Sequence, residues 1–140
     1  MAERKVHAVC AVISRDYSVF SCQRGHGDMQ GGWEFPGGTV EKGETGEQAL
    51  RREISEELAA RLSTVWFLDT VEQDYGDFHL TLDCYVCTLA PGEEPTLLEH
   101  SDARWLGRDE LLDVDWLPAD RKVAMSLGGL WDALFSAEHL

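Results

Sequence analysis

The sequence is poor in positive charge. It has 12 Lys and Arg residues against 26 Asp and Glu residues, a formal net charge of −14. A field of this sign repels polyanions unless a local patch reverses it. We therefore expect no nucleic-acid polymer and no membrane surface as partner. A small phosphorylated ligand stays open, because bound divalent cations reverse the field locally.

The sequence also lacks an apolar run that would cross a bilayer, which takes about 20 residues. The longest run, residues 6–13, is too short and contains His7. The N-terminus shows no small-residue cleavage site, so we expect no signal peptide. The sequence also shows no internal repeat, no low-complexity tract and no linker. A length of 140 residues then predicts one domain over residues 1–140.

Cysteine is scarce, and its four copies are Cys10, Cys22, Cys84 and Cys87. The last two have the C-x-x-C spacing of metal and redox sites. Their segment is typical of a strand, however, and positions i and i+3 of a strand point to opposite faces. We interpret all four as reduced side chains packed like small hydrophobes. This use of cysteine favours a reducing, cytoplasmic location.

Six segments have the alternation and the composition of strands. They are residues 5–14, 17–24, 33–35, 65–75, 78–89 and 103–106. Arg15-Asp16 and Gly76-Asp77 are the expected hairpin turns. Two further segments predict helices, one over residues 45–60 and one that begins at Pro118, with a helical turn at 109–112 between them.

The first predicted helix has Thr45 as its N-cap and an apolar face of Leu50, Ile54 and Leu58. The second has an apolar stripe that we interpret as core: Val123, Leu127, Leu130, Trp131 and Leu134. The element order is then β, β, β, α, β, β, β, α. This order predicts an α/β fold in which helices pack on a mixed sheet.

An acidic cluster lies on the first predicted helix. Glu53, Glu56 and Glu57 stand at positions i, i+3 and i+4, which places them on one arc of the helix. Three ionised carboxylates this close repel one another, although an ordinary solvated acidic face would also show this pattern. A hard divalent cation removes the repulsion, and magnesium keeps positions for water and substrate phosphates. Arg52 beside the cluster has the geometry to orient a carboxylate.

The stretch 38–60 resembles the Nudix box, G-x5-E-x7-R-E-U-x-E-E-x-G-U, where U is aliphatic. Its charged positions all match, with Gly38, Glu44, Arg52, Glu53, Glu56 and Glu57. Ala59 occupies the final glycine position of the box and Ala60 the last aliphatic one. If that glycine position needs a left-handed backbone, alanine costs of order 1 kcal/mol there.

The resemblance implies an α/β/α sandwich around a mixed sheet. It implies Mg²⁺ as cofactor, with Mn²⁺ as a substitute, bound by Glu53, Glu56, Glu57 and the carbonyl of Gly37. Glu99, six residues before Trp105, matches a loop carboxylate that adds a metal ligand. By the same analogy Glu44 and Arg52 support the cluster. Glu53, or Glu99 as second choice, activates the attacking water.

The chain looks closest to the MutT-like branch, which hydrolyses nucleoside triphosphates to monophosphate and pyrophosphate. The resemblance then implies a substrate site of Arg24, Glu34, Phe35, Tyr75, Leu80 and Asp120. Arg24 would pair with a phosphate, and Phe35, Tyr75 and Leu80 would wall the base. Asp120 would read a base edge: an ionised carboxylate favours an amino group, as in cytosine or adenine, whereas a protonated one suits oxidised guanine.

Two other functions stay open. The box also serves hydrolases of ADP-ribose, dinucleoside polyphosphates and nucleotide sugars. A non-catalytic domain that binds nucleotide as a sensor is the third reading, although such domains usually lose box carboxylates. We expect a small-molecule nucleotide as the only ligand besides metal, and either a monomer or a homodimer.

Overall fold

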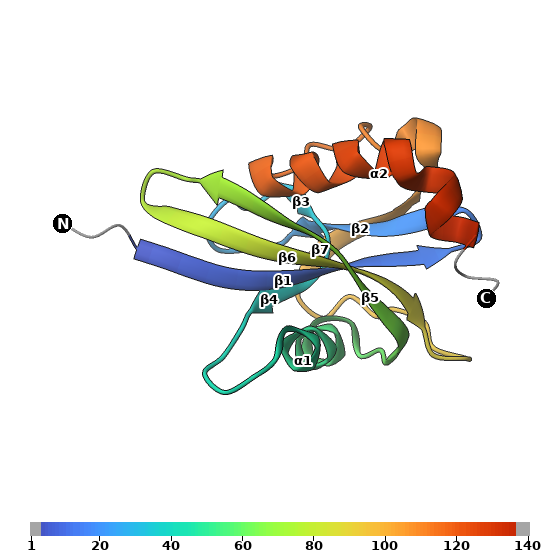
Figure 1. Cartoon of the computed structure of the whole chain (residues 1–140), viewed down its shortest axis with the longest axis horizontal. Helices are drawn as coiled ribbons and strands as arrows, with labels where there is room; N and C mark the ends of the chain where they lie inside the picture. Colours follow the sequence, from blue (N-terminus) through green and yellow to red (C-terminus); the bar gives the residue numbers. More distant parts are fainter. Residues whose placement is uncertain (1–3, 137–140) are drawn as a thin grey trace.

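A mixed sheet of seven strands lies between two helices, one on each face (Figure 1). The structure, a computed structural model, describes residues 4–136. The strands are β1 (Arg4–Arg15), β2 (Ser18–Arg24), β3 (Trp33–Glu34), β4 (Gly37–Thr39), β5 (Leu62–Asp74), β6 (Phe78–Leu89) and β7 (His100–Leu106). Their order is β3-β2-β1-β6-β5, with β4 on β1 and β7 on β2. Strands β1 and β6 run parallel and the other pairs antiparallel.

The long strand β1 divides the core into two. Alternate residues of a strand face opposite sides of the sheet, so Val9, Ala11 and Ile13 pack toward helix α1 (Gly46–Leu58), whereas Cys10 and Val12 pack toward helix α2 (Pro118–Ser136). Cys84 and Cys87 of β6 likewise belong to different core clusters, which confirms that they do not form a C-x-x-C site. The predicted α/β sandwich is therefore confirmed.

Helix α1 begins after the predicted N-cap but ends at Leu58, two residues earlier than expected. Thr45 caps it: its hydroxyl accepts from the Gln48 N–H, and the Gln48 side chain accepts from the Thr45 N–H. Leu50, Ile54 and Leu58 are fully buried. Its C-cap is Ala59, whose φ of 51° and ψ of 39° are left-handed. The position therefore needs the conformation that glycine adopts without strain.

The first hairpin turn and the third strand differ from expectation. The pair Arg15–Ser18 closes the hairpin, so the turn residues are Asp16 and Tyr17, both with positive φ, and not Arg15-Asp16. The predicted strand 33–35 is two short strands, β3 and β4, separated at Pro36. Proline has no N–H for a sheet ladder, and the Pro36 carbonyl accepts from the Ala11 N–H instead.

Several element limits were also predicted wrongly. Strands β5 and β7 begin three residues earlier than expected, because backbone pairing extends them beyond their apolar stretches. The expected helical turn is a 3₁₀ turn over Arg108–Glu110. Leu130 is 46% exposed, so it does not belong to the core stripe of α2. Within residues 4–136 no helix has the length and hydropathy for a bilayer crossing.

We predict that Ala59→Gly stabilises the fold by about 1 kcal/mol, because it relieves a Cβ in a left-handed conformation. Urea denaturation measures the free energy of unfolding. The matched control is Ala133→Gly at an exposed position inside α2, where the same change should destabilise by up to about 1 kcal/mol. A change in the free energy of unfolding that has the same sign in both variants would contradict the strain at Ala59.

Candidate active site

Strand β4 brings two glycines against both β1 and helix α1. Gly37 and Gly38 pair with Cys10 and Val9 of β1. A Cβ on Gly37 would overlap the Val9 carbonyl oxygen, whereas a Cβ on Gly38 would overlap the Glu53 carboxylate. The chain therefore uses glycine here so that the β4 backbone touches the acidic face of α1.

Glu57 is the buried member of this acidic face. It is 8% exposed, and its Oε2 accepts a hydrogen bond of 3.0 Å from the Gly37 N–H. Burial, followed by the nearby charges of Glu34 and Glu53, raises the pKa of Glu57 to about 9. Burial also raises the pKa of Glu53, and Glu56 is the most exposed of the three. The ionised cluster is thus costly without a compensating cation.

Arg52 supplies part of that compensation. Its Nε and Nη2 donate to the two oxygens of Glu44 at 2.8 and 2.9 Å. Its Nη1 donates to Glu53 at 2.8 Å, and Nη2 also donates to the Thr39 carbonyl at 3.0 Å. The hydrogen bonds from Arg52 are the largest cause that lowers the pKa of Glu44 to about 2. Arg52 thus ties the loop before α1 to the helix and fixes one oxygen of Glu53.

Glu99 lies at the start of β7, across a hollow from the acidic face. The hollow has a volume of about 300 Å³, and its lining includes Gly37, Glu57, Glu99 and His100. The negative charge of Glu99 contributes to the raised pKa of both Glu53 and Glu57. Within residues 4–136 no three acidic, histidine or cysteine side chains converge closely enough to form a finished ion cage.

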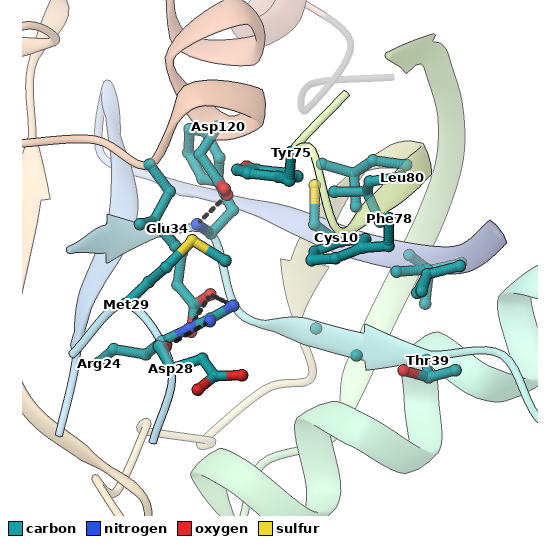
Figure 2. A pocket seen from close by; sticks show the side chains of 18 of the residues that line it. Cys10, Arg24, Asp28, Met29, Glu34, Thr39, Tyr75, Phe78, Leu80 and Asp120 are labelled. Atoms are coloured by element: carbon teal, nitrogen blue, oxygen red, sulfur yellow. Dashed lines mark hydrogen bonds and ion pairs between the residues drawn. The ribbon is translucent and has the colours of Figure 1, made fainter. Parts of the chain in front are cut away.

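A second cavity, of about 260 Å³, opens beside the first (Figure 2). It has aromatic walls: Phe35 stacks on Trp116 with ring centroids 4.6 Å apart, and Tyr75 stacks on Phe78 at 5.1 Å. The structure brings all six predicted substrate residues to its lining: Arg24, Glu34, Phe35, Tyr75, Leu80 and Asp120. Flat walls of this kind suit a planar, partly apolar ligand.

Asp120 lies at the inner wall of this cavity, at the start of α2 (Figure 2). It is 7% exposed, and its Oδ1 accepts a hydrogen bond of 2.9 Å from the Phe35 N–H. Burial, with the charge of Glu34 as the next cause, raises the pKa of Asp120 to about 8. At neutral pH its carboxyl group is therefore largely protonated and has a proton to donate.

Glu34 forms the boundary between the two cavities, since it lines both. Its Oε1 accepts from Arg24 Nε and Nη2 at 3.1 and 2.9 Å, and its Oε2 lies 3.0 Å from His100 Nε2. Burial alone would raise the pKa of Glu34, but hydrogen bonds from His100 and Arg24 hold it below its usual value. Glu34 therefore stays ionised next to two acids that do not.

A family model described as NUDIX domain matches residues 3–127. The chain belongs to this family. An 8-oxo-dGTP diphosphatase of Proteus vulgaris is 42% identical over 90 residues, which are 63% of this chain and 80% of the relative. The nucleoside triphosphatase NudI of Escherichia coli O17:K52:H18 is 35% identical over 138 residues, 87% and 95% of the two chains. The solved MutT NUDIX hydrolase of Burkholderia pseudomallei superposes with a TM-score of 0.79 at 26% identity, covering 88% and 98%.

The chain is thus a Nudix hydrolase of the MutT-like kind. Nudix hydrolases generally need a divalent metal ion and act on small nucleotides. The residues present fit such an ion. Glu53, Glu56, Glu57 and Glu99 offer only oxygen donors, and burial keeps Glu57 from ionising cheaply unless a cation is bound.

Some residues of the Nudix site escaped the sequence reasoning. Phe78, Met29 and Leu117 line the nucleoside-sized cavity, and His100 contacts Glu34. Phe78 and Leu117 look like ordinary core in sequence, and Met29 lies in a loop without periodicity. His100 follows Glu99 directly, so its proximity to a predicted ligand was the one signal available.

The two glycines of β4 give a matched test. Gly38→Ala should fold with a free energy of unfolding within about 1 kcal/mol of wild type, because the flexible end of Glu53 moves aside. Its activity should fall by about 10²-fold or more, since Glu53 is displaced. Gly37→Ala meets a backbone carbonyl that has no such freedom, so it should lose stability instead. Thermal denaturation and turnover of both variants, measured side by side, check this, and a stable, active Gly38→Ala enzyme would contradict the contact.

The raised pKa of Asp120 predicts a pH-dependent stability. A carboxyl that binds its proton more tightly when folded favours the fold at low pH, and this contribution is lost as pH rises from about 4 to about 8. Asp120→Asn removes the titration. Its free energy of unfolding should therefore rise relative to wild type across this range, by a few kcal/mol. Urea denaturation from pH 5 to 9 measures it. The exposed Asp77→Asn is the control, and a pH-independent difference for Asp120→Asn would refute the assignment.

Proposed function

We propose that this chain hydrolyses nucleoside triphosphates, including ones with an oxidised base, to nucleoside monophosphate and pyrophosphate. The observation that carries the proposal is the junction of two cavities at Glu34. On one side lie the acidic residues of α1, and on the other an aromatic-walled cavity that suits a base. A nucleotide laid across the junction has its base among Phe35, Tyr75 and Leu80 and its phosphates near the carboxylates.

Glu53, Glu56, Glu57, Glu99 and the carbonyl of Gly37 would hold Mg²⁺, or Mn²⁺ in its place. The ion supplies charge neutralisation for the phosphate chain and for the leaving pyrophosphate. The protein supplies orientation: Gly38 and Arg52 fix Glu53 from two sides, and the dry walls of the base cavity hold the nucleoside.

Glu53 is the first choice for the residue that takes a proton from the attacking water, and Glu99 is the second. Arg52 donates to one oxygen of Glu53 and so holds the carboxylate in place to accept that proton. Water adds to phosphorus, the anhydride bond between the α and β phosphates breaks, and the proton of water ends on the glutamate. The monophosphate and pyrophosphate then leave.

Oxidised guanine is our choice among the bases left open, and it is compatible with a protonated Asp120. A protonated carboxyl both donates and accepts a hydrogen bond, which matches a base edge that carries an acceptor beside a donor. Cytosine and adenine also present an acceptor beside their amino group, so a protonated Asp120 is compatible with them as well. The Proteus vulgaris relative, named an 8-oxo-dGTP diphosphatase, agrees with this choice.

We further propose a cytoplasmic enzyme that acts as one domain, either as a monomer or as a homodimer. Four free cysteines support the location, since all of them are buried and none forms a disulfide within residues 4–136.

A panel of purified triphosphates tests the function: cytosine, adenine, guanine and 8-oxoguanine nucleotides, ribo and deoxy, with ADP-ribose added. With Mg²⁺ we expect monophosphate and pyrophosphate, with 8-oxo-dGTP turned over fastest. Glu53→Gln should lower kcat by about 10²-fold or more. Glu47→Gln, on the same helix but paired with Arg51, should stay within about twofold. Chromatography of the products measures both, and release of no monophosphate from any triphosphate would end the proposal.

A further inference from the structure

His100 is a buried polar residue to which the proposed chemistry assigns no role. Its side chain is 3% exposed. Nε2 lies 3.0 Å from Glu34 Oε2, and Nδ1 is buried without a hydrogen-bond partner among the described residues. Burying a polar nitrogen unpaired costs stability, so a simple packing role would be better served by an apolar side chain. Within residues 4–136 the hydrogen bond to Glu34 is the side-chain contact that explains a histidine at this place.

A β-bulge aims His100 at the site. Strands β2 and β7 pair regularly up to Gln23 and Asp102, but the next pair is Arg24 with His100. In a regular ladder Arg24 would lie opposite Ser101. The extra residue moves His100 beside Arg24, which is how bulges redirect side chains near active sites. Gly25 leaves room for this bend, because a Cβ there would lie 3.1 Å from the Glu99 carbonyl oxygen.

Three neighbouring strands thereby assemble one clamp. His100 comes from β7, Arg24 from β2 and Glu34 from β3. Both oxygens of Glu34 are held, Oε2 by His100 and Oε1 by two nitrogens of Arg24 (the latter pair is drawn in Figure 2). The remaining Arg24 nitrogen, Nη1, donates to the Asp28 carbonyl. Two of the three guanidinium nitrogens therefore depend on the orientation of Glu34, and the third is held by the Asp28 carbonyl.

We propose that His100 is a positioning residue that, by holding Glu34, fixes Arg24 at the junction of the two cavities for the substrate's phosphate chain. This rests on the proposed function. His100 acts through Glu34 and not on the acidic face of α1, since its hydrogen bond goes to Glu34 alone among the described partners. Its loss should therefore weaken substrate binding and leave the chemical step nearly intact.

Gln and Met have side chains of equal length, so replacing His100 by each of them separates the effect of the hydrogen bond from the effect of packing. His100→Gln keeps a donor within reach of Glu34, and His100→Met fills similar space without one. We expect His100→Met to raise KM for the preferred triphosphate about tenfold, as the loss of a hydrogen bond to a charged group predicts, with kcat within about twofold. His100→Gln should stay within about threefold of the wild-type KM. His79→Met is the control, because His79 makes a like contact with Glu72 outside both cavities.

A double-variant cycle tests whether the effect passes through Glu34. If it does, adding His100→Met to Glu34→Met, which removes both acceptor oxygens, raises KM no further. Equal KM values for the Gln and Met variants, a loss confined to kcat, or additive effects in the cycle would each overturn the proposal. If the Met variant does not fold, His100→Asn, whose amide is too short to reach Glu34, takes its place.

A measurement on the enzyme without substrate tests the role of His100 separately from the proposed function. The Arg24 Nε–H resonance in ¹⁵N spectra, assigned by its loss in Arg24→Lys, should shift and broaden in His100→Met and stay sharp in His100→Gln. A wild-type enzyme that turns over no triphosphate but shows this pattern would refute the function and keep the clamp. A resonance that is the same in both variants would refute the clamp even in an active enzyme.

Discussion

Repulsion among buried carboxylates is the constraint on which the rest of this structure depends. The chain carries a net charge of −14 and nevertheless places Glu57 and Asp120 in its interior, where the charge of Glu34 helps to raise the pKa of both. Two arginines, Arg24 and Arg52, bind carboxylates of the two cavities and of α1. Arg52 binds the acids of α1, and Arg24 binds Glu34, so ionised and protonated carboxyl groups coexist a few residues apart.

The sheet explains why these charges meet at all. Strand β1 pairs with β4 and, further along, with β2. The stretch of chain that includes β4, residues 33–39, contacts the acidic face of α1 and also the start of α2. That stretch offers backbone N–H groups to acids on both sides of the sheet: Gly37 to Glu57, and Phe35 to Asp120. One segment thus links the carboxylates of the two helices, which lie on opposite faces.

Local patterns made much of this predictable. The capped helix α1, the acids at i, i+3 and i+4, and the hairpin at Gly76 depend on near neighbours in sequence, and all appear in the structure. Features that depend on packing between distant elements could not be predicted from the sequence. The exposure of Leu130 depends on which arc of α2 meets the sheet, and the recruitment of Phe78 and Leu117 depends on packing between distant elements. The burial of Asp120 and its raised pKa likewise follow from tertiary contacts that no spacing reveals.

The irregular pairing between β2 and β7 has a consequence for how this chain tolerates insertions and deletions. Residues 90–98 lie between strands, but the N–H groups of Thr96 and Leu98 donate to the Leu58 and Glu57 carbonyls, so a change in length disturbs the end of α1 least before Thr96. From Glu99 to Trp105 an insertion or deletion falls in the β2–β7 ladder, which already holds one extra residue beside Arg24, and it would change how Glu99 and His100 are presented to the two cavities. Lineages that lengthen or shorten this protein should therefore do so before Thr96, and drift in the spacing between Glu99 and Trp105 would mark copies that have lost the original activity.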